Sequence, residues 1–198
     1  MATHEPEVEP FLTLGPDDEG RPVSAEEFAS ARFLEPWKYE REAGRLVIMP
    51  PDGQRHIESS EPWWERLVVY CVQHRDVVQH VVPNSWVRVD GGTDRIGDIG
   101  VYLAPNGPVP PIPDRVPELM FEVVTPDKKS RGRDYVTKRA EYHRLGVREY
   151  VIVDRQARRV TVLTHAAEGY REHVLGPSDT YRTPLLPGLE VPLAEALC

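Results

Sequence analysis

Two short apolar segments enclose a helical pattern, and this arrangement constrains the fold more than any other part of the chain. Residues 118–125 (ELMFEVVT) and 149–154 (EYVIVD) are almost entirely apolar, as is typical of strands buried on both faces. Residues 130–145 between them follow a helical pattern that ends at Gly146, a C′ glycine. A strand, helix and strand of this length predict a right-handed crossover between parallel strands. The chain is therefore expected to be an α/β protein.

The other segments extend this pattern in both directions. Ser24 and Glu27 form the capping box of a short helix, and residues 38–50 predict a hairpin around Gly44. Helices are also expected at 56–75 and in the final VPLAEAL. Strands are expected at 77–89, around a Pro83-Asn84 turn, and at 96–103, followed by an irregular proline-rich connection at 104–117. A further hairpin is expected at 159–164 and 169–175. The prediction is a mixed central β-sheet flanked by helices, with an added N-terminal hairpin and a C-terminal β-hairpin.

The length of 198 residues fits one domain with a substantial core. Residues 1–22 are acidic and rich in proline and glycine, so we expect a flexible tail followed by a single domain at 23–198. Cys71 and Cys198 are too few for a disulfide framework, which fits a reducing cytoplasm. No apolar run approaches the roughly 20 residues of a membrane span, so no membrane association is expected.

The charge is unevenly distributed. The chain has a net charge of −8, which argues against a general nucleic-acid coat protein. Residues 128–148, however, carry a net charge of +6, and the remainder carries −14. A basic strip on an acidic body is expected, and phosphate contacts would be confined to that strip.

Glu122 is the anomalous charge of the apolar segment at 118–125. It lies between Met120 and Val124 on one face of the expected strand, where an ionised carboxylate needs a cation, a hydrogen-bond network or a proton. Asp98, on the strand at 96–103, is the nearest candidate of its kind, and two carboxylates suit Mg²⁺ or Mn²⁺. The alternative is that Asp98 caps a turn and that Glu122 meets a buried arginine or lysine.

Asp134 and Lys138 lie four residues apart in the helical segment that follows. The spacing places both side chains on one helix face, which would turn toward the strands if it carried a site. An acid four residues before a base is equally typical of an ordinary surface ion pair. The pair becomes informative only together with Asp98 and Glu122.

Several motifs, in this order, resemble the Uma2 (DUF820) family of the PD-(D/E)XK nuclease superfamily. They are Tyr39-Glu40 with a glycine at 44, then LVIMPP, DIGVYL, FEVVTP, D-x-x-x-K and GVREYVIVD, spanning about residues 38 to 193. The resemblance implies a restriction-endonuclease-like fold. It identifies Asp98, here preceded by Gly97, with the PD aspartate and Glu122 with the acidic residue of the (D/E)XK element.

The same resemblance implies roles for further residues. The third position of the (D/E)XK element is Val124, so its lysine is absent and Lys138 becomes the substitute. Glu40 matches an additional acidic residue of the superfamily, and His56 opens the helix where the family often places a histidine. Asp134 is a supporting residue on the same helix as Lys138.

The implied function is a Mg²⁺-dependent (or Mn²⁺-dependent) endonuclease that hydrolyses DNA phosphodiester bonds. Asp98 and Glu122 would hold the metal, and Lys138 would orient water or neutralise charge. The expected backbone contacts are Lys128, Lys129, Arg131, Arg133 and Arg139. A homodimer would let two sites address two strands. The alternatives are a module that keeps the fold and binds nucleic acid or protein without cleavage, and hydrolysis of another phosphodiester.

Overall fold

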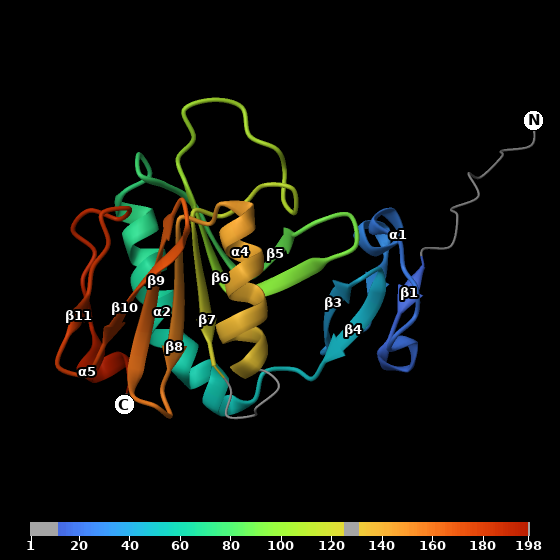
Figure 1. Cartoon of the computed structure of the whole chain (residues 1–198), viewed down its shortest axis with the longest axis horizontal. Helices are drawn as coiled ribbons and strands as arrows, with labels where there is room; N and C mark the ends of the chain where they lie inside the picture. Colours follow the sequence, from blue (N-terminus) through green and yellow to red (C-terminus); the bar gives the residue numbers. More distant parts are fainter. Residues whose placement is uncertain (1–11, 125–130, 198) are drawn as a thin grey trace, which may run out of the picture. The chain divides into compact units, whose positions relative to one another are not determined.

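A computed structural model describes residues 12–124 and 131–197 of the chain. The chain divides into two compact units, which Figure 1 draws together and which are described separately below. The first unit comprises residues 1–51 and 90–94, and the second comprises residues 52–89 and 95–198. The division of the chain into a tail at 1–22 and a single domain at 23–198 stays a prediction.

The first unit is built around a hairpin. Its elements are β1 (Thr13–Leu14), η1 (Pro16–Asp18), α1 (Ala25–Ser30), β2 (Arg32–Phe33), β3 (Lys38–Glu42) and β4 (Arg45–Met49). β3 and β4 pair antiparallel, with Glu42 opposite Arg45, and the two residues between them, Ala43 and Gly44, both have positive φ. Two such residues form the turn whose twist suits a two-residue hairpin, so the predicted hairpin is present. The Ser24 side chain accepts from the Glu27 amide, as the capping box predicts.

Residues 12–22, which the sequence assigns to a tail, have regular structure. β1 pairs parallel with β2, and Leu14 is completely buried. The Gly20 amide donates to the Leu46 carbonyl at 2.9 Å, which ties this segment to β4. Burial of the Leu14 side chain favours an ordered segment, although the composition around it is acidic and rich in proline. Residues 1–11 lie outside the described residues.

The second unit contains a mixed sheet. Its strands are β5 (Val78–Arg88), β6 (Asp94–Leu103), β7 (Leu119–Val123), β8 (Glu149–Asp154), β9 (Arg159–Ala166) and β10 (Gly169–Leu175). They follow the order β10-β9-β8-β7-β6, and β5 pairs with β6. β7 and β8 are parallel, whereas the β6–β7, β8–β9 and β9–β10 pairs are antiparallel. The expected crossover between parallel strands is therefore present.

Helices cover both faces of this sheet. Leu119, Phe121 and Val123 of β7 pack in one core with side chains of α2 (Gln54–Gln73) and α5 (Leu193–Ala196). Met120 and Val124 pack in a second core with Tyr142 of α4 (Arg139–Leu145). Because side chains alternate along a strand, Glu122 lies on the α4 face together with Met120. Figure 1 shows α2 and α4 on opposite sides of the strands.

The expected helix at 130–145 is not α-helical throughout. Residues 133–138 form a π-helix, η2 (Arg133–Lys138), and α4 follows directly and ends at Gly146 in the left-handed conformation. A π-helix has i→i+5 hydrogen bonds and is a rare element that often marks functional sites. Both Asp134 and Lys138 are buried in it. The four-residue spacing predicts their proximity, and the altered helical winding was not predicted.

Two other elements differ from the expectation. The strands predicted at 77–89 around Pro83-Asn84 are one continuous strand, β5, in which Asn84 has a φ of 48°. Asparagine tolerates this conformation better than most residues, so the strand continues through the position. Two short strands, β11 (Thr180–Tyr181) and β12 (Val191–Pro192), pair before α5. No helix within the described ranges has both the length and the hydropathy needed to cross a membrane.

Candidate active site

Glu122 is a buried carboxylate with two donors. It lies on β7 and is 3% exposed, and its Oε1 accepts from Lys138 Nζ at 2.8 Å and from the Tyr142 hydroxyl at 3.1 Å. The pKa of Glu122 is raised to about 8, mainly by burial; Lys138 opposes this rise, and the nearby carboxylates of Asp98 and Asp134 add to it. A carboxylate in this position is costly unless a cation compensates it.

Lys138 supplies that cation from the end of η2. Its side chain is almost completely buried, and Nζ also donates to the Ile96 carbonyl of β6 at 2.9 Å. The distance from Nζ to Asp134 Oδ1 is 3.8 Å. The structure therefore brings together three residues named from the sequence, Glu122, Lys138 and Asp134. The predicted alternative in which Glu122 meets a buried arginine or lysine is confirmed, with Lys138 as the partner.

Asp98 lies on β6 beside this cluster. β6 and β7 pair with Ile99 opposite Phe121, and continuing the register by one residue places Asp98 opposite Glu122. One carboxylate oxygen of Asp98 accepts from the Val123 amide at 2.7 Å, and the other lies 3.3 Å from His56 Nε2. Asp98 thus bridges two strands and the start of α2.

Asp52, His56 and Asp98 could hold a metal ion. One ligand atom from each lies within 4.8 Å of the others, and all three residues are half-buried. Two carboxylates and one imidazole form a mainly hard-oxygen donor set, which fits Mn²⁺ or Mg²⁺. Glu122 is not a member of this group of described side chains, and its Oε1 accepts from Lys138 and Tyr142.

Asp52 is the member of this group that sequence reasoning missed. It lies between the hairpin predicted at residues 38–50 and the helix predicted at 56–75, outside every predicted site. The missed signal is its position four residues before His56, and the two side chains approach to 3.7 Å. An acid and a histidine at this spacing across a helix start can converge on one point.

A buried ion pair joins the strand of Asp98 to the helix that follows Lys138. Arg95 of β6 donates from Nε and from one terminal nitrogen to the two carboxylate oxygens of Glu141 on α4, both at 2.8 Å. The Arg95 side chain is 1% exposed. Bidentate pairs of this kind restrict orientation as well as distance. The pair therefore links β6 to α4, which directly follows Lys138.

Three of the basic residues predicted to bind phosphate lie close to carboxylates of the chain itself. Arg131 donates to Asp154 at 2.6 Å, and Arg139 donates to Glu172 at 2.7 Å. Arg133 Nε lies 3.9 Å from Asp134 Oδ1. Lys128 and Lys129, which belong to the same prediction, lie outside the described residues.

Glu40 belongs to the first unit. It lies on β3 opposite Val47, and its side chain is completely buried. Its predicted place in the catalytic site stays a prediction.

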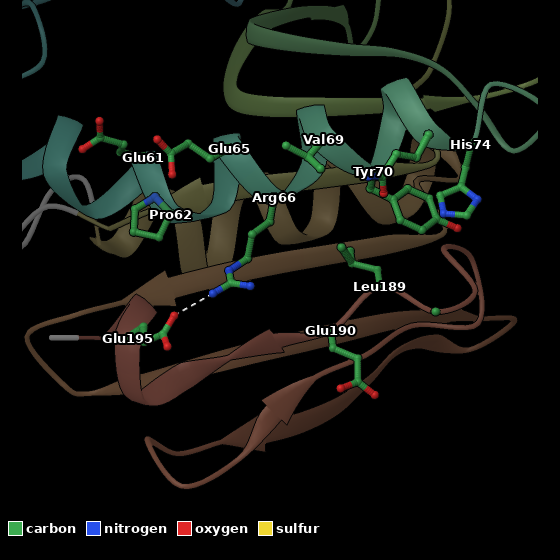
Figure 2. Close-up of a pocket in the computed structure, with 12 residues that line it drawn as sticks. Glu61, Pro62, Glu65, Arg66, Val69, Tyr70, His74, Leu189, Glu190 and Glu195 are labelled. Atoms are coloured by element: carbon green, nitrogen blue, oxygen red, sulfur yellow. Dashed lines mark hydrogen bonds and ion pairs between the residues drawn. The ribbon is translucent and has the colours of Figure 1, made fainter.

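A groove lies elsewhere in the second unit, along the outer side of α2. It has a volume of about 920 Å³, and the segment Gly188–Glu190 and Glu195 of α5 form its other side. Figure 2 shows its residues, with Arg66 reaching from α2 to Glu195. Its lining includes none of Asp98, Glu122 and Lys138, so this groove and the carboxylate cluster are separate features.

Comparison with known proteins supports the predicted architecture. The sequence model of the Uma2 family, described as "Putative restriction endonuclease", matches residues 25–194. The structure is similar to the crystal structure of a protein described as "a putative nuclease belonging to DUF820" from Anabaena variabilis ATCC 29413. That similarity has a TM-score of 0.70 at 14% identity and covers 89% of this chain and 98% of the other. No curated protein matches. The predicted mixed α/β, restriction-endonuclease-like fold is confirmed.

Proposed function

The chain belongs to the Uma2 family, and from this premise we propose that it is a Mg²⁺-dependent endonuclease that hydrolyses phosphodiester bonds of DNA. The observation that carries the proposal is the buried cluster of Glu122, Lys138 and Asp134 beside Asp98. Burying several charges is costly, and such clusters concentrate at functional sites. The family and its DUF820 structural relative, both described in terms of nucleases, support the same proposal.

Asp98 is the central metal ligand in this proposal. It has neighbours on two sides, since Glu122 lies opposite it on β7 and His56 lies 3.3 Å away at the start of α2. Asp98 and Glu122 would hold the cation, and Asp52 and His56 would complete the donor set. A divalent cation bound there supplies Lewis-acid polarisation of the phosphate and of water.

Lys138 has two tasks in the proposed site. Its ammonium group favours the ionised form of Glu122 that a metal ligand requires, because it opposes the rise in the pKa of Glu122 that burial causes. It also places a positive charge beside the carboxylates, where negative charge develops on the phosphate. Asp134, 3.8 Å from Nζ, helps to hold Lys138 in place.

The duplex would contact cationic residues that lie before α4 and at its first position. Lys128, Lys129, Arg131, Arg133 and Arg139 are the proposed phosphate contacts. Arg131 and Arg139 would exchange their bonds to Asp154 and Glu172 for bonds to phosphate. Phosphate contacts carry no base information and weaken with salt, so binding should be sequence-tolerant and sensitive to ionic strength.

Plasmid nicking tests the proposal. Supercoiled DNA is incubated with wild type, Asp98→Ala and Glu122→Ala in Mg²⁺ or Mn²⁺, and Glu168→Ala, an exposed residue of the second unit, is the matched control. We expect nicking by wild type and the control, its loss in both site variants, and its loss with EDTA. Glu122→Gln serves where Glu122→Ala fails to fold. Undiminished nicking by folded Asp98→Ala and Glu122→Gln contradicts the proposal.

A second candidate is a module that keeps the nuclease fold and binds without cleavage. Val124 in place of the lysine of the (D/E)XK element favours it, as do the carboxylate partners of Arg131 and Arg139. Binding of DNA by wild type without nicking in either metal would select this candidate. A parallel RNA substrate separates preference for DNA from general phosphodiester hydrolysis.

A further inference from the structure

The outer side of α2 carries apolar side chains in unusual positions. Val69 is 54% exposed and Val72, one turn later, is 61% exposed. Val69 lines the groove of Figure 2, where Leu189 of the C-terminal segment contributes a further apolar side chain. Covering such side chains is favourable by roughly 25 cal/mol for each Å² removed from water. Val69 shares the groove with the apolar residues Pro62, Tyr70 and Leu189, and an exposed apolar side chain in such a groove is typical of an interaction surface.

The rim of the same groove is acidic. Four glutamates line it, and the one arginine among the lining residues, Arg66, is held by Glu195 at 2.6 Å. Glu190 lies 2.8 Å from Arg182, and both of these side chains are more than half exposed. Glu61 and Glu65 make no ion pair with any described residue, and Figure 2 shows both side chains extending from α2. The groove therefore has an apolar floor and an excess of negative charge.

These charges restrict the possible occupant. A nucleic acid or an anionic membrane would be repelled by the glutamates. The same face of a second copy would bring its own glutamates against Glu61 and Glu65, which disfavours a symmetric α2–α2 contact. An occupant with lysine or arginine side chains beside apolar ones meets both features of the groove.

We propose that the groove between α2 and the segment Gly188–Glu190 is a docking site for a basic, amphipathic segment of a protein partner. The apolar side chains of that segment cover Val69, beside the buried Leu189, and its cations lie near Glu61, Glu65 and Glu190. The Arg66–Glu195 pair bounds the groove toward α5. The proposal is independent of the nuclease activity, since none of Asp98, Glu122 and Lys138 lines the groove.

The test measures binding of a labelled synthetic amphipathic peptide of leucine and lysine to the full chain by fluorescence anisotropy. A peptide with glutamate in place of lysine is the specificity control. The protein variants are Glu61→Lys/Glu65→Lys and Val69→Ser. Glu26→Lys/Glu168→Lys makes the same change in net charge at exposed positions outside the groove.

We expect Glu61→Lys/Glu65→Lys to weaken binding of the lysine peptide by about tenfold and Val69→Ser to weaken it by about threefold, with under about twofold change in the control. Equal weakening in the groove and control variants would mean bulk charge attraction and would overturn the proposal. Absence of binding to wild type would overturn it as well. Sedimentation of wild type alone tests the remaining occupant, because a dimer that Glu61→Lys/Glu65→Lys dissociates would assign the groove to a second copy instead.

Discussion

Lys138 Nζ lies 2.8 Å from Glu122 Oε1, and both side chains are almost completely removed from solvent. The two residues come from η2 and β7, on one face of the sheet. In a buried pair each charge offsets the desolvation penalty of the other. Removing one partner therefore lowers the free energy of unfolding more than replacing both. Several expected outcomes depend on this relationship.

Lys138→Met should be strongly destabilising. It leaves Glu122 buried without its cation, and we expect the free energy of unfolding to fall by about 3 kcal/mol or more. Urea unfolding followed by circular dichroism measures this change. In the double variant Lys138→Met/Glu122→Gln much of the loss should be recovered, because no uncompensated charge remains. A double variant as unstable as Lys138→Met would contradict the coupling.

The ion pair between Arg95 and Glu141 should control the position of Lys138. Glu141→Ala frees α4 from β6, so Lys138, otherwise protected, should react faster with an amine-acylating reagent as measured by mass spectrometry. The charge-reversed variant Arg95→Glu/Glu141→Arg should restore part of the protection. Leu163→Ala, which removes core packing in the same unit, is the control for lost stability alone. Equal labelling in Glu141→Ala and wild type would show that α4 is held by other contacts.

Glu149 should make stability depend on pH. Burial raises the pKa of Glu149 above its ordinary value of 4.5, although hydrogen bonds from Tyr181 and Thr183 oppose the shift. The folded state therefore binds the proton more tightly, and the free energy of unfolding should fall as pH rises from about 4.5 through the raised pKa. Glu149→Gln stays neutral, so its stability relative to wild type should increase between about pH 5 and about pH 8 in urea unfolding. A constant difference, as expected of the exposed control Glu168→Gln, would contradict this.

His56 and Asp52 should contribute to metal binding. Calorimetric titration of Mn²⁺ into His56→Ala and Asp52→Asn should show affinity reduced by roughly tenfold or more, because each variant removes one donor. Glu168→Gln should bind as wild type does. Asp98→Asn should have the largest effect, since Asp98 adjoins both His56 and Glu122. Unchanged affinity in His56→Ala would restrict the ligands to Asp98 and Glu122.

Some features of the site can be read from local pattern alone. The apolar segments around residues 130–145 predict parallel strands joined by a helix, and alternation along β7 predicts that Glu122 faces a core. Spacing predicts that Asp134 and Lys138 share one helix face. The π-helical winding of η2, however, depends on the packing of that segment and has no signature in its spacing.

The strand–helix–strand unit around residues 130–145 and the anomalous charge at Glu122 follow from the sequence alone, because periodicity and residue type along a short stretch indicate them. The missing lysine at Val124 follows from the family resemblance. Only the tertiary structure decided which groups meet. Lys138 forms an ion pair with Glu122, and Arg95 forms one with Glu141. The side chain of Asp52 lies close to those of His56 and Asp98. These contacts join residues distant in sequence, and Asp52 and His56, four residues apart, meet Asp98 only through the fold. Their geometry comes from sheet register and from the docking of helices on its faces, which no local pattern encodes.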